Sequence, residues 1–133
     1  MRAVRSTDTK PEMRVRRLAH RLGYRFRLHR ADLPGTPDLV FAAKRKVIFV
    51  HGCFWHGHDC RRGARRPKAN ADYWRAKIER NAARDVANGE ALRAAGWAVL
   101  VLWECELKDE AALAERLRAF LDDGRRMRHD ASQ

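Results

Sequence analysis

The segment His51–Cys60, HGCFWHGHDC, gathers metal-binding and aromatic side chains within a few residues. Cys53, His58 and Cys60 have the spacing C-x4-H-x-C, and Cys105 in WEC offers a further thiol. Thiolate and imidazole ligands in a closed tetrahedral set are typical of structural zinc, and this set uses every cysteine of the chain. The sequence therefore predicts a structural Zn²⁺ site. The alternative is three buried thiols with solvent-facing histidines.

A second candidate group contains Asp38, which stands where the loop LPGTP becomes an apolar strand. A carboxylate in that place can bind Mg²⁺ beside a phosphate. His51 and His56 stay outside the zinc set, and an imidazole suits proton transfer or donation to a phosphate oxygen. The alternatives are ordinary turn chemistry for the aspartate and surface positions for the histidines.

Apolar periodicity, capping residues and glycines predict the elements that position these side chains. Thr9 and Glu12 form a capping box for a first helix that ends at Gly23. The further elements are a strand over 24–30, a hairpin of 38–42 and 47–51, a helix over 72–95 with Trp74, Ile78, Ala82 and Val86 on one face, a buried strand over 97–103 and a helix over 109–124.

The hairpin register decides whether Asp38 and His51 lie opposite each other. A tight turn over 43–46 would pair Ala42 with Val47 and place Asp38 opposite His51. The order helix, strand, hairpin, helix, strand, helix predicts an α/β fold with a mixed sheet flanked by helices. We expect residues 1–124 to form one domain and residues 125–133 to be a frayed basic tail.

Composition points to an acidic polymer as the partner. The formal net charge of the 133-residue chain is +12, and nucleic acid is the commonest polyanion that such a charge binds. We expect no membrane partner, since no apolar run approaches the length of a membrane span. The polar N-terminus shows no signal peptide and the cysteine number is odd, so we expect a cytoplasmic protein.

Four segments, LPGTPDLVF, VIFVHGCFWHGHDC, YWRAKIERNAARD and GWAVLVLWECEL, closely resemble the very short patch repair (Vsr) endonucleases. The resemblance extends from about Met1 to about Leu121. It implies a restriction-endonuclease-like fold, a structural zinc and a Mg²⁺-dependent activity on double-stranded DNA by a monomer. The implied reaction nicks one strand 5′ to the thymine of a T·G mismatch that arises by deamination of 5-methylcytosine.

The resemblance also implies roles for individual residues. The catalytic residues would be Asp38, His51, His56 and Glu12, the zinc ligands Cys53, His58, Cys60 and Cys105, and the DNA-intercalating aromatics Phe54, Trp55 and Trp74. Mg²⁺ would bind Asp38 and the backbone carbonyl of Val50. Trp74 has an alternative role as a core residue of its helix. Family members usually carry an N-terminal arm before the equivalent of Met1, so we expect weaker DNA binding here.

Two other functions fit parts of the sequence. One is a sequence- or structure-specific nuclease of the same fold that needs no mismatch. The other is a non-catalytic zinc module that only binds nucleic acid. Asp38 and the two histidines outside the zinc set favour an enzyme, because binding alone requires none of them.

The zinc site predicts about one Zn²⁺ per chain by elemental analysis of the purified protein. Structural zinc contributes about 10–16 kcal/mol of apparent binding free energy in small peptides, so Cys105→Ser should lower the melting temperature strongly. A metal-free protein with an unchanged melting temperature would refute the site.

Overall fold

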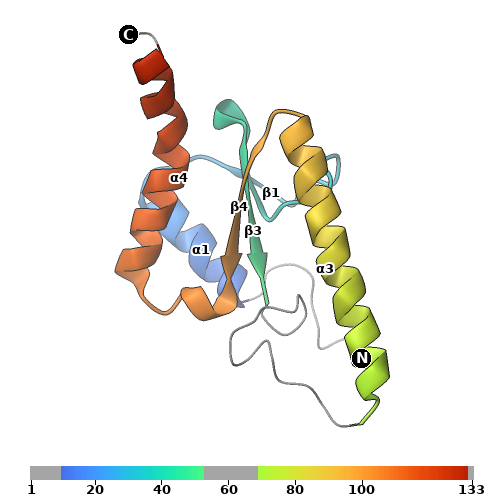
Figure 1. Ribbon diagram of the computed structural model, residues 1–133. Coiled ribbons are helices and arrows are strands. Elements are labelled where there is room, and N and C mark those ends of the chain that lie inside the picture. The colour runs from blue at the N-terminus through green and yellow to red at the C-terminus, as the bar shows by residue number, and fades with distance from the viewer. Residues whose placement is uncertain (1–9, 53–68, 132–133) are drawn as a thin grey trace.

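Four strands form one mixed sheet in the computed structural model, which describes residues 10–52 and 69–131 (Figure 1). Their order across the sheet is β1 (Arg27–Leu28), β2 (Leu39–Phe41), β3 (Lys46–His51) and β4 (Ala98–Trp103). The β1–β2 and β2–β3 pairs are antiparallel, whereas β3 and β4 run parallel. Parallel neighbours need a long crossover connection, and helix α3 (Ala71–Ala94) lies between these two strands in the chain.

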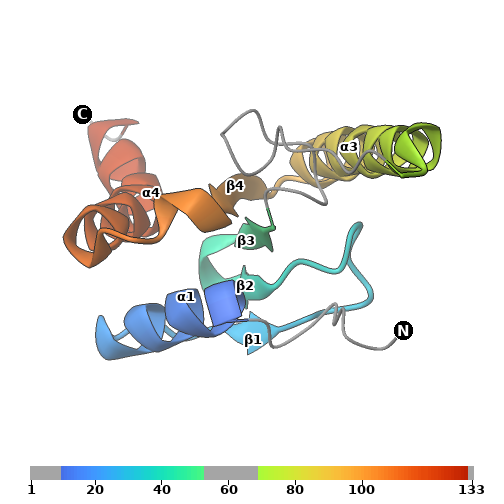
Figure 2. The same ribbon diagram turned by 90° about the horizontal axis from the view of Figure 1, so that it is seen from below.

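Helices cover both faces of this sheet. Helices α1 (Lys10–Arg21) and α4 (Glu110–Ala131) lie on one face, and α3 lies on the other (Figures 1 and 2). Alternate strand residues therefore enter two separate cores, as the two-residue period of a strand requires. Within the described ranges the fold is a four-stranded mixed sheet with three α-helices, which confirms the predicted α/β class and element order.

The composition of the two cores shows how the sheet divides its side chains. Leu39, Phe41 and Ile48 pack with α1 and α4, whereas Val40 and Val47 pack towards α3. The first core also contains Val15, Leu18, Ala19, Leu102, Leu107, Leu113, Ala114, Leu117 and Leu121, and the second contains Phe49, Leu92 and Trp97. Burial of these side chains is the main stabilising contribution to the fold.

Glycines end two of the helices as the sequence predicts. After α1, the Gly23 amide donates to the His20 carbonyl and the Tyr24 amide to the Ala19 carbonyl, with φ of +93° at the glycine. After α3, the Gly96 amide donates to the Arg93 carbonyl and the Trp97 amide to the Leu92 carbonyl, with φ of +94° at Gly96. This is the Schellman arrangement, in which a residue with positive φ lets the last carbonyls find donors. Thr9 of the predicted capping box lies outside the described residues.

The predicted hairpin register is wrong by two residues. Val40, not Ala42, pairs with Val47, and Phe41 pairs with Lys46. The turn is a 3₁₀ segment η1 (Ala42–Lys44) closed by Arg45 in the left-handed region at φ 58°, so Lys46 already belongs to the strand. A shift of two residues keeps every side chain on its predicted face. It removes the cross-strand pairing of Asp38 with His51 on which the sequence argument rested.

The inner face of α3 also differs from the prediction. Ile78 is buried as expected, but the side chain of Val86 is 61% exposed. The helix instead buries Gly89 and Leu92. Residues spaced by four advance about 40° per step around a helix of 3.6 residues per turn, so such a stripe leaves the sheet after a few steps.

Strand β4 is only partly buried, although its apolar sequence predicts a buried strand. Leu102 alone among its residues is fully covered, because β4 is an edge strand of the sheet. At the opposite edge only Arg27–Leu28 pair with β2, fewer residues than the predicted strand over 24–30. Helix α4 continues past residue 124, and the domain boundary placed there stays a prediction. In the described parts of the chain, no helix is long and apolar enough to cross a membrane.

The loop over 29–38 joins β1 to β2 and reaches across to α3. At its neck the His29 amide donates to the Asp38 carbonyl at 3.3 Å. At its tip Gly35 has φ of +78° and lies so close to Asn88 that an added Cβ would be 2.9 Å from the Nδ2 atom. Glycine is thus required at this position for both its conformation and its size.

Gly35→Ala should destabilise the protein more than Gly23→Ala. Both alanines would adopt positive φ, which costs about 1–2 kcal/mol, but nothing lies within 4 Å of a Cβ at Gly23. The contact with Asn88 should add about 1–3 kcal/mol for the loop glycine, as overpacking usually does. Urea denaturation of the two variants measures the difference. Equal free energies of unfolding would show that the loop tip does not press on α3.

Candidate functional site

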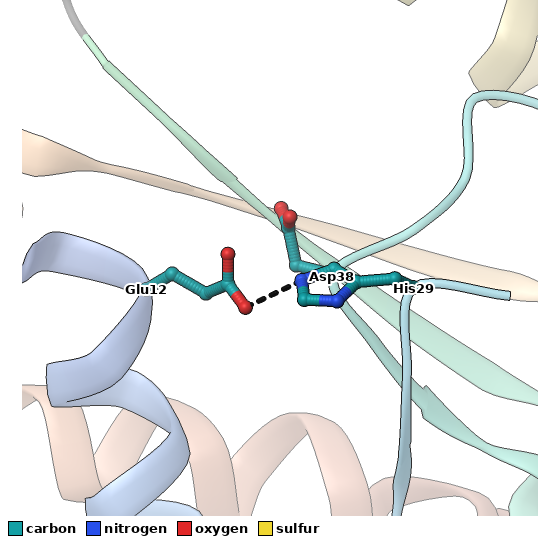
Figure 3. Close-up of side chains that lie close together, drawn as sticks. All are labelled: Glu12, His29 and Asp38. Carbon is teal, nitrogen blue, oxygen red and sulfur yellow. Dashed lines mark hydrogen bonds and ion pairs between the residues drawn. The ribbon is translucent and has the colours of Figure 1, made fainter. Parts of the chain in front are cut away.

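Side chains from three separate segments converge beyond the ends of the first strands. Glu12 comes from α1, His29 follows β1, and Asp38 immediately precedes β2 (Figure 3). One carboxylate oxygen from each acid and one ring nitrogen of the histidine all lie within 4.8 Å of one another. Among the described residues this is the one group of three such side chains that could hold a metal ion.

Glu12 is the buried member of this group. Its side chain is 2% exposed and lies in the first turn of α1, where the positive end of the helix dipole favours a carboxylate. The Oε2 atom lies 2.6 Å from Nε2 of His29, and Nη1 of Arg16 approaches the same oxygen at 3.5 Å. A buried carboxylate requires such partners, because the loss of hydration is costly without them.

His29 is a site residue that the sequence analysis missed. Its backbone has φ of 48°, an uncommon conformation for a residue other than glycine. The pairing of Leu28 with Leu39 continues into the bond from the His29 amide to the Asp38 carbonyl, which places the two residues opposite each other. The signal was available in the sequence, since aligning the first strand against the second would have brought them together.

Asp38 is oriented by the neighbouring strand. Its Oδ2 atom accepts a hydrogen bond from the Val50 amide at 2.7 Å. This bond crosses the hairpin and ties the carboxylate to the backbone near the end of β3. The role of the Val50 carbonyl in binding Mg²⁺ stays a prediction, because the contact seen here uses the amide.

His51 lies apart from the Glu12–His29–Asp38 group. It is the last residue of β3 and is nearly buried, with Nδ1 3.9 Å from a carboxylate oxygen of Asp85 on α3. The edge of its ring packs against Trp103 at a centroid distance of 5.1 Å. Asp85 was not singled out from the sequence, although it falls within one of the four segments that carry the family resemblance. A carboxylate at Nδ1 can orient the imidazole ring.

The other predicted site residues divide into two sets. Trp74 is half-buried in the first turn of α3 and packs edge-on against the exposed ring of Tyr73 at 5.1 Å. Cys105 is half-buried in the 3₁₀ segment η2 (Glu104–Glu106) that follows β4. The predicted residues Cys53, Phe54, Trp55, His56, His58 and Cys60 lie outside the described residues. The zinc, intercalation and general-base predictions thus stay untested.

The donor atoms of the group fit a divalent cation. Carboxylate oxygens are the ligands that Mg²⁺ and Mn²⁺ prefer, and imidazole nitrogen is accepted by Mn²⁺ and the later transition metals. Two carboxylates also supply the negative charge that a divalent ion neutralises. The same side chains can instead be held together by hydrogen bonding alone, as the bond between Glu12 and His29 shows.

The short contact between Glu12 and His29 predicts strong energetic coupling between them. Glu12→Ala should cost about 1–3 kcal/mol, because it leaves the half-buried imidazole without this acceptor. His29→Ala should cost a similar amount, and the double variant should cost less than the sum, with a coupling of about 0.5–3 kcal/mol. Chemical denaturation of the four proteins closes this cycle. Strict additivity would mean that the contact contributes nothing to stability.

Comparison with known proteins places these residues in a family context. A family model described as DNA mismatch endonuclease Vsr matches residues 1–62. That segment includes Glu12, His29, Asp38 and His51, so all three members of the convergent group lie within it.

Individual relatives cover almost the whole chain. A type II nicking enzyme of Xanthomonas oryzae pv. oryzae is 61% identical over 122 residues, which are 92% of this chain and 89% of that protein. A type II nicking enzyme of Neisseria meningitidis serogroup A is 44% identical over 91% of this chain and 86% of that protein. The DNA mismatch endonuclease Vsr of Escherichia coli K12 is 40% identical over 91% and 80%, respectively. This chain therefore belongs to the Vsr family and is a DNA strand-nicking endonuclease.

Proposed function

We propose that this endonuclease hydrolyses one phosphodiester bond in one strand of duplex DNA at the group formed by Glu12, His29 and Asp38, with a divalent metal ion. The observation that carries the proposal is the convergence of these side chains within 4.8 Å in a chain of this family. The net charge of +12 supports DNA as the substrate, because neutralisation of phosphates supplies much of the affinity of proteins for duplex DNA.

The residues would divide the work as follows. Asp38 would hold the metal, and its bond from the Val50 amide fixes the direction of its carboxylate. A bound Mg²⁺ would act as a Lewis acid on the phosphate and stabilise the charge of the transition state. Glu12 carries a second carboxylate into the site from the start of α1. We propose that His56 activates the attacking water.

His51 would act from the other side of the sheet end. Its ring is held between Trp103 and Phe49, with Asp85 beside Nδ1. An imidazole held in this way suits a hydrogen bond to the phosphate or proton donation to the leaving oxygen.

The zinc and the DNA-wedging aromatics belong to the proposal too. The parallel register pairs His51 with Trp103, so the chain leaves β3 towards Cys53 and leaves β4 towards Cys105 at the same end of the sheet. This shared exit supports a zinc site that links the two segments. A zinc-stapled loop would present Phe54 and Trp55 to the DNA stack, with Trp74 as a third aromatic. Stacking on an aromatic contributes about 1–3 kcal/mol per base.

Two alternative substrate specificities are proposed for this enzyme. The first is nicking at a specific DNA sequence or structure without a mismatch, which the descriptions of the relatives at 61% and 44% identity favour. The second is nicking 5′ to the thymine of a T·G mismatch from 5-methylcytosine deamination. The description of the family model and of the relative at 40% identity favours that preference. A weakened T·G pair would lower the cost of inserting an aromatic wedge.

Paired duplexes that differ in a single base distinguish these preferences. Labelled T·G and C·G duplexes of the same flanking sequences, incubated with the protein and Mg²⁺, should both be nicked if no mismatch is required. Cleavage confined to the T·G duplex would establish the mismatch preference instead. Denaturing gel electrophoresis identifies both the strand and the bond that is cut.

Asp38→Asn should reduce nicking of the labelled duplex that the wild type cuts by about a hundredfold or more, because the amide removes the charge that would hold the metal. The matched control is Asp32→Asn in the same loop, whose carboxylate is exposed and paired with Arg30. That control should nick at the wild-type rate. Full activity of the Asp38 variant would place the catalytic carboxylate elsewhere.

A further inference from the structure

We propose that His29 is a third protein ligand in a divalent-metal site with Glu12 and Asp38, and that its imidazole makes the site prefer Mn²⁺ to Mg²⁺. The family resemblance assigns metal binding here to Asp38 and the Val50 carbonyl, so the histidine is an addition to that site. The inference deepens the proposed function and rests on it for the presence of a divalent metal.

Backbone geometry supports a functional position for His29. The residue adopts φ of 48°, and its own amide donates a hydrogen bond to the Asp38 carbonyl. These two features bring the imidazole and the Asp38 carboxylate to the same end of the β1–β2 pair, on the side where α1 begins (Figure 3). A strained backbone conformation at a convergent site is a common mark of function.

The side-chain geometry adds a nitrogen donor to two oxygen donors. Nε2 of His29 is the ring atom that faces Glu12, at 2.6 Å from Oε2, and the side chain is 21% exposed. An oxygen of Asp38 is the third donor, and one donor atom from each of the three residues lies within 4.8 Å of the other two. An ion placed among these atoms would exchange the hydrogen bond between Glu12 and His29 for two coordination bonds.

The donor set decides which cation this site should prefer. Mg²⁺ favours oxygen ligands and retains several waters, so an imidazole adds little to its binding. Mn²⁺ accepts carboxylate oxygen and also imidazole nitrogen, and it binds less well to thiolates than zinc does. A site with one nitrogen and two carboxylates should therefore discriminate between these ions, whereas a site of oxygen atoms alone should discriminate less.

The test uses the complete chain as purified. Binding of Mn²⁺ is measured by the loss of the free-ion signal in electron paramagnetic resonance, and Mg²⁺ is measured by competition. His29→Gln keeps a donor for Glu12 but removes the imidazole. It should weaken Mn²⁺ binding by about tenfold or more, a typical loss for a metal site that loses a supporting residue, and change Mg²⁺ binding much less. The matched control is His20→Gln, an exposed histidine on α1, which should change neither.

A spectroscopic measurement separates a ligand from a residue that only positions Glu12. Electron spin echo modulation of bound Mn²⁺ should show nitrogen coupling in the wild type and in His20→Gln but not in His29→Gln. An unchanged ratio of Mn²⁺ to Mg²⁺ affinity in His29→Gln would overturn the inference. A wild type that binds Mn²⁺ no better than Mg²⁺ would also overturn the inference. This second outcome does not depend on whether the variant folds. Mn²⁺ binding without any nicking of DNA would refute the proposed function and leave this metal site standing.

Discussion

The burial of one carboxylate shapes the candidate site. Glu12 is almost completely covered, and a charged oxygen in that position is stable only with close hydrogen-bonding partners. His29 is such a partner, with Nε2 at 2.6 Å from the Glu12 Oε2 atom. Its position depends in turn on the neck of the loop, where its amide bonds to Asp38. The buried carboxylate of Glu12 thus links α1 to His29 after β1, and His29 is bonded to Asp38 before β2. The convergent group results from these two bonds.

Elements outside the Glu12–His29–Asp38 group hold the loop over 29–38 and the Asp38 side chain in place. The loop over 29–38 is anchored at its tip by the contact of Gly35 with Asn88, on the helix that covers the opposite face of the sheet. The strand β3 supplies the amide of Val50 that orients Asp38, and β3 itself is held between β2 and β4. Functional side chains are positioned with greater precision on helices and strands than on loops. Here the bond from β3 fixes the candidate metal-binding carboxylate of Asp38, although that residue lies just before a strand.

A nicking enzyme needs both general attraction to DNA and a local site for hydrolysis. The excess of basic residues supplies the first, since it acts on any phosphate regardless of sequence. In the proposed mechanism the second requires concentrated negative charge, so that a divalent metal would bind among the cationic residues. Burial of Glu12 beside the partly buried Asp38 favours this separation, while most basic side chains of the described residues are exposed. Under the proposed function, both substrate preferences would use this one group for hydrolysis and would differ in what contacts the bases.

The sequence by itself determined the class of fold, the order of the elements and the two glycine helix ends, because periodicity, capping and positive φ are local properties. It also singled out Glu12, by its place in a capping box, and Asp38, by its place where a loop becomes a strand. Only the tertiary structure decided the register of the hairpin, which depends on how one turn closes, and Asp38 is therefore not the cross-strand partner of His51. The part played by His29 was likewise decided in three dimensions. Its chemistry depends on Glu12 from another element, and no local pattern encodes a contact between residues so far apart in the chain.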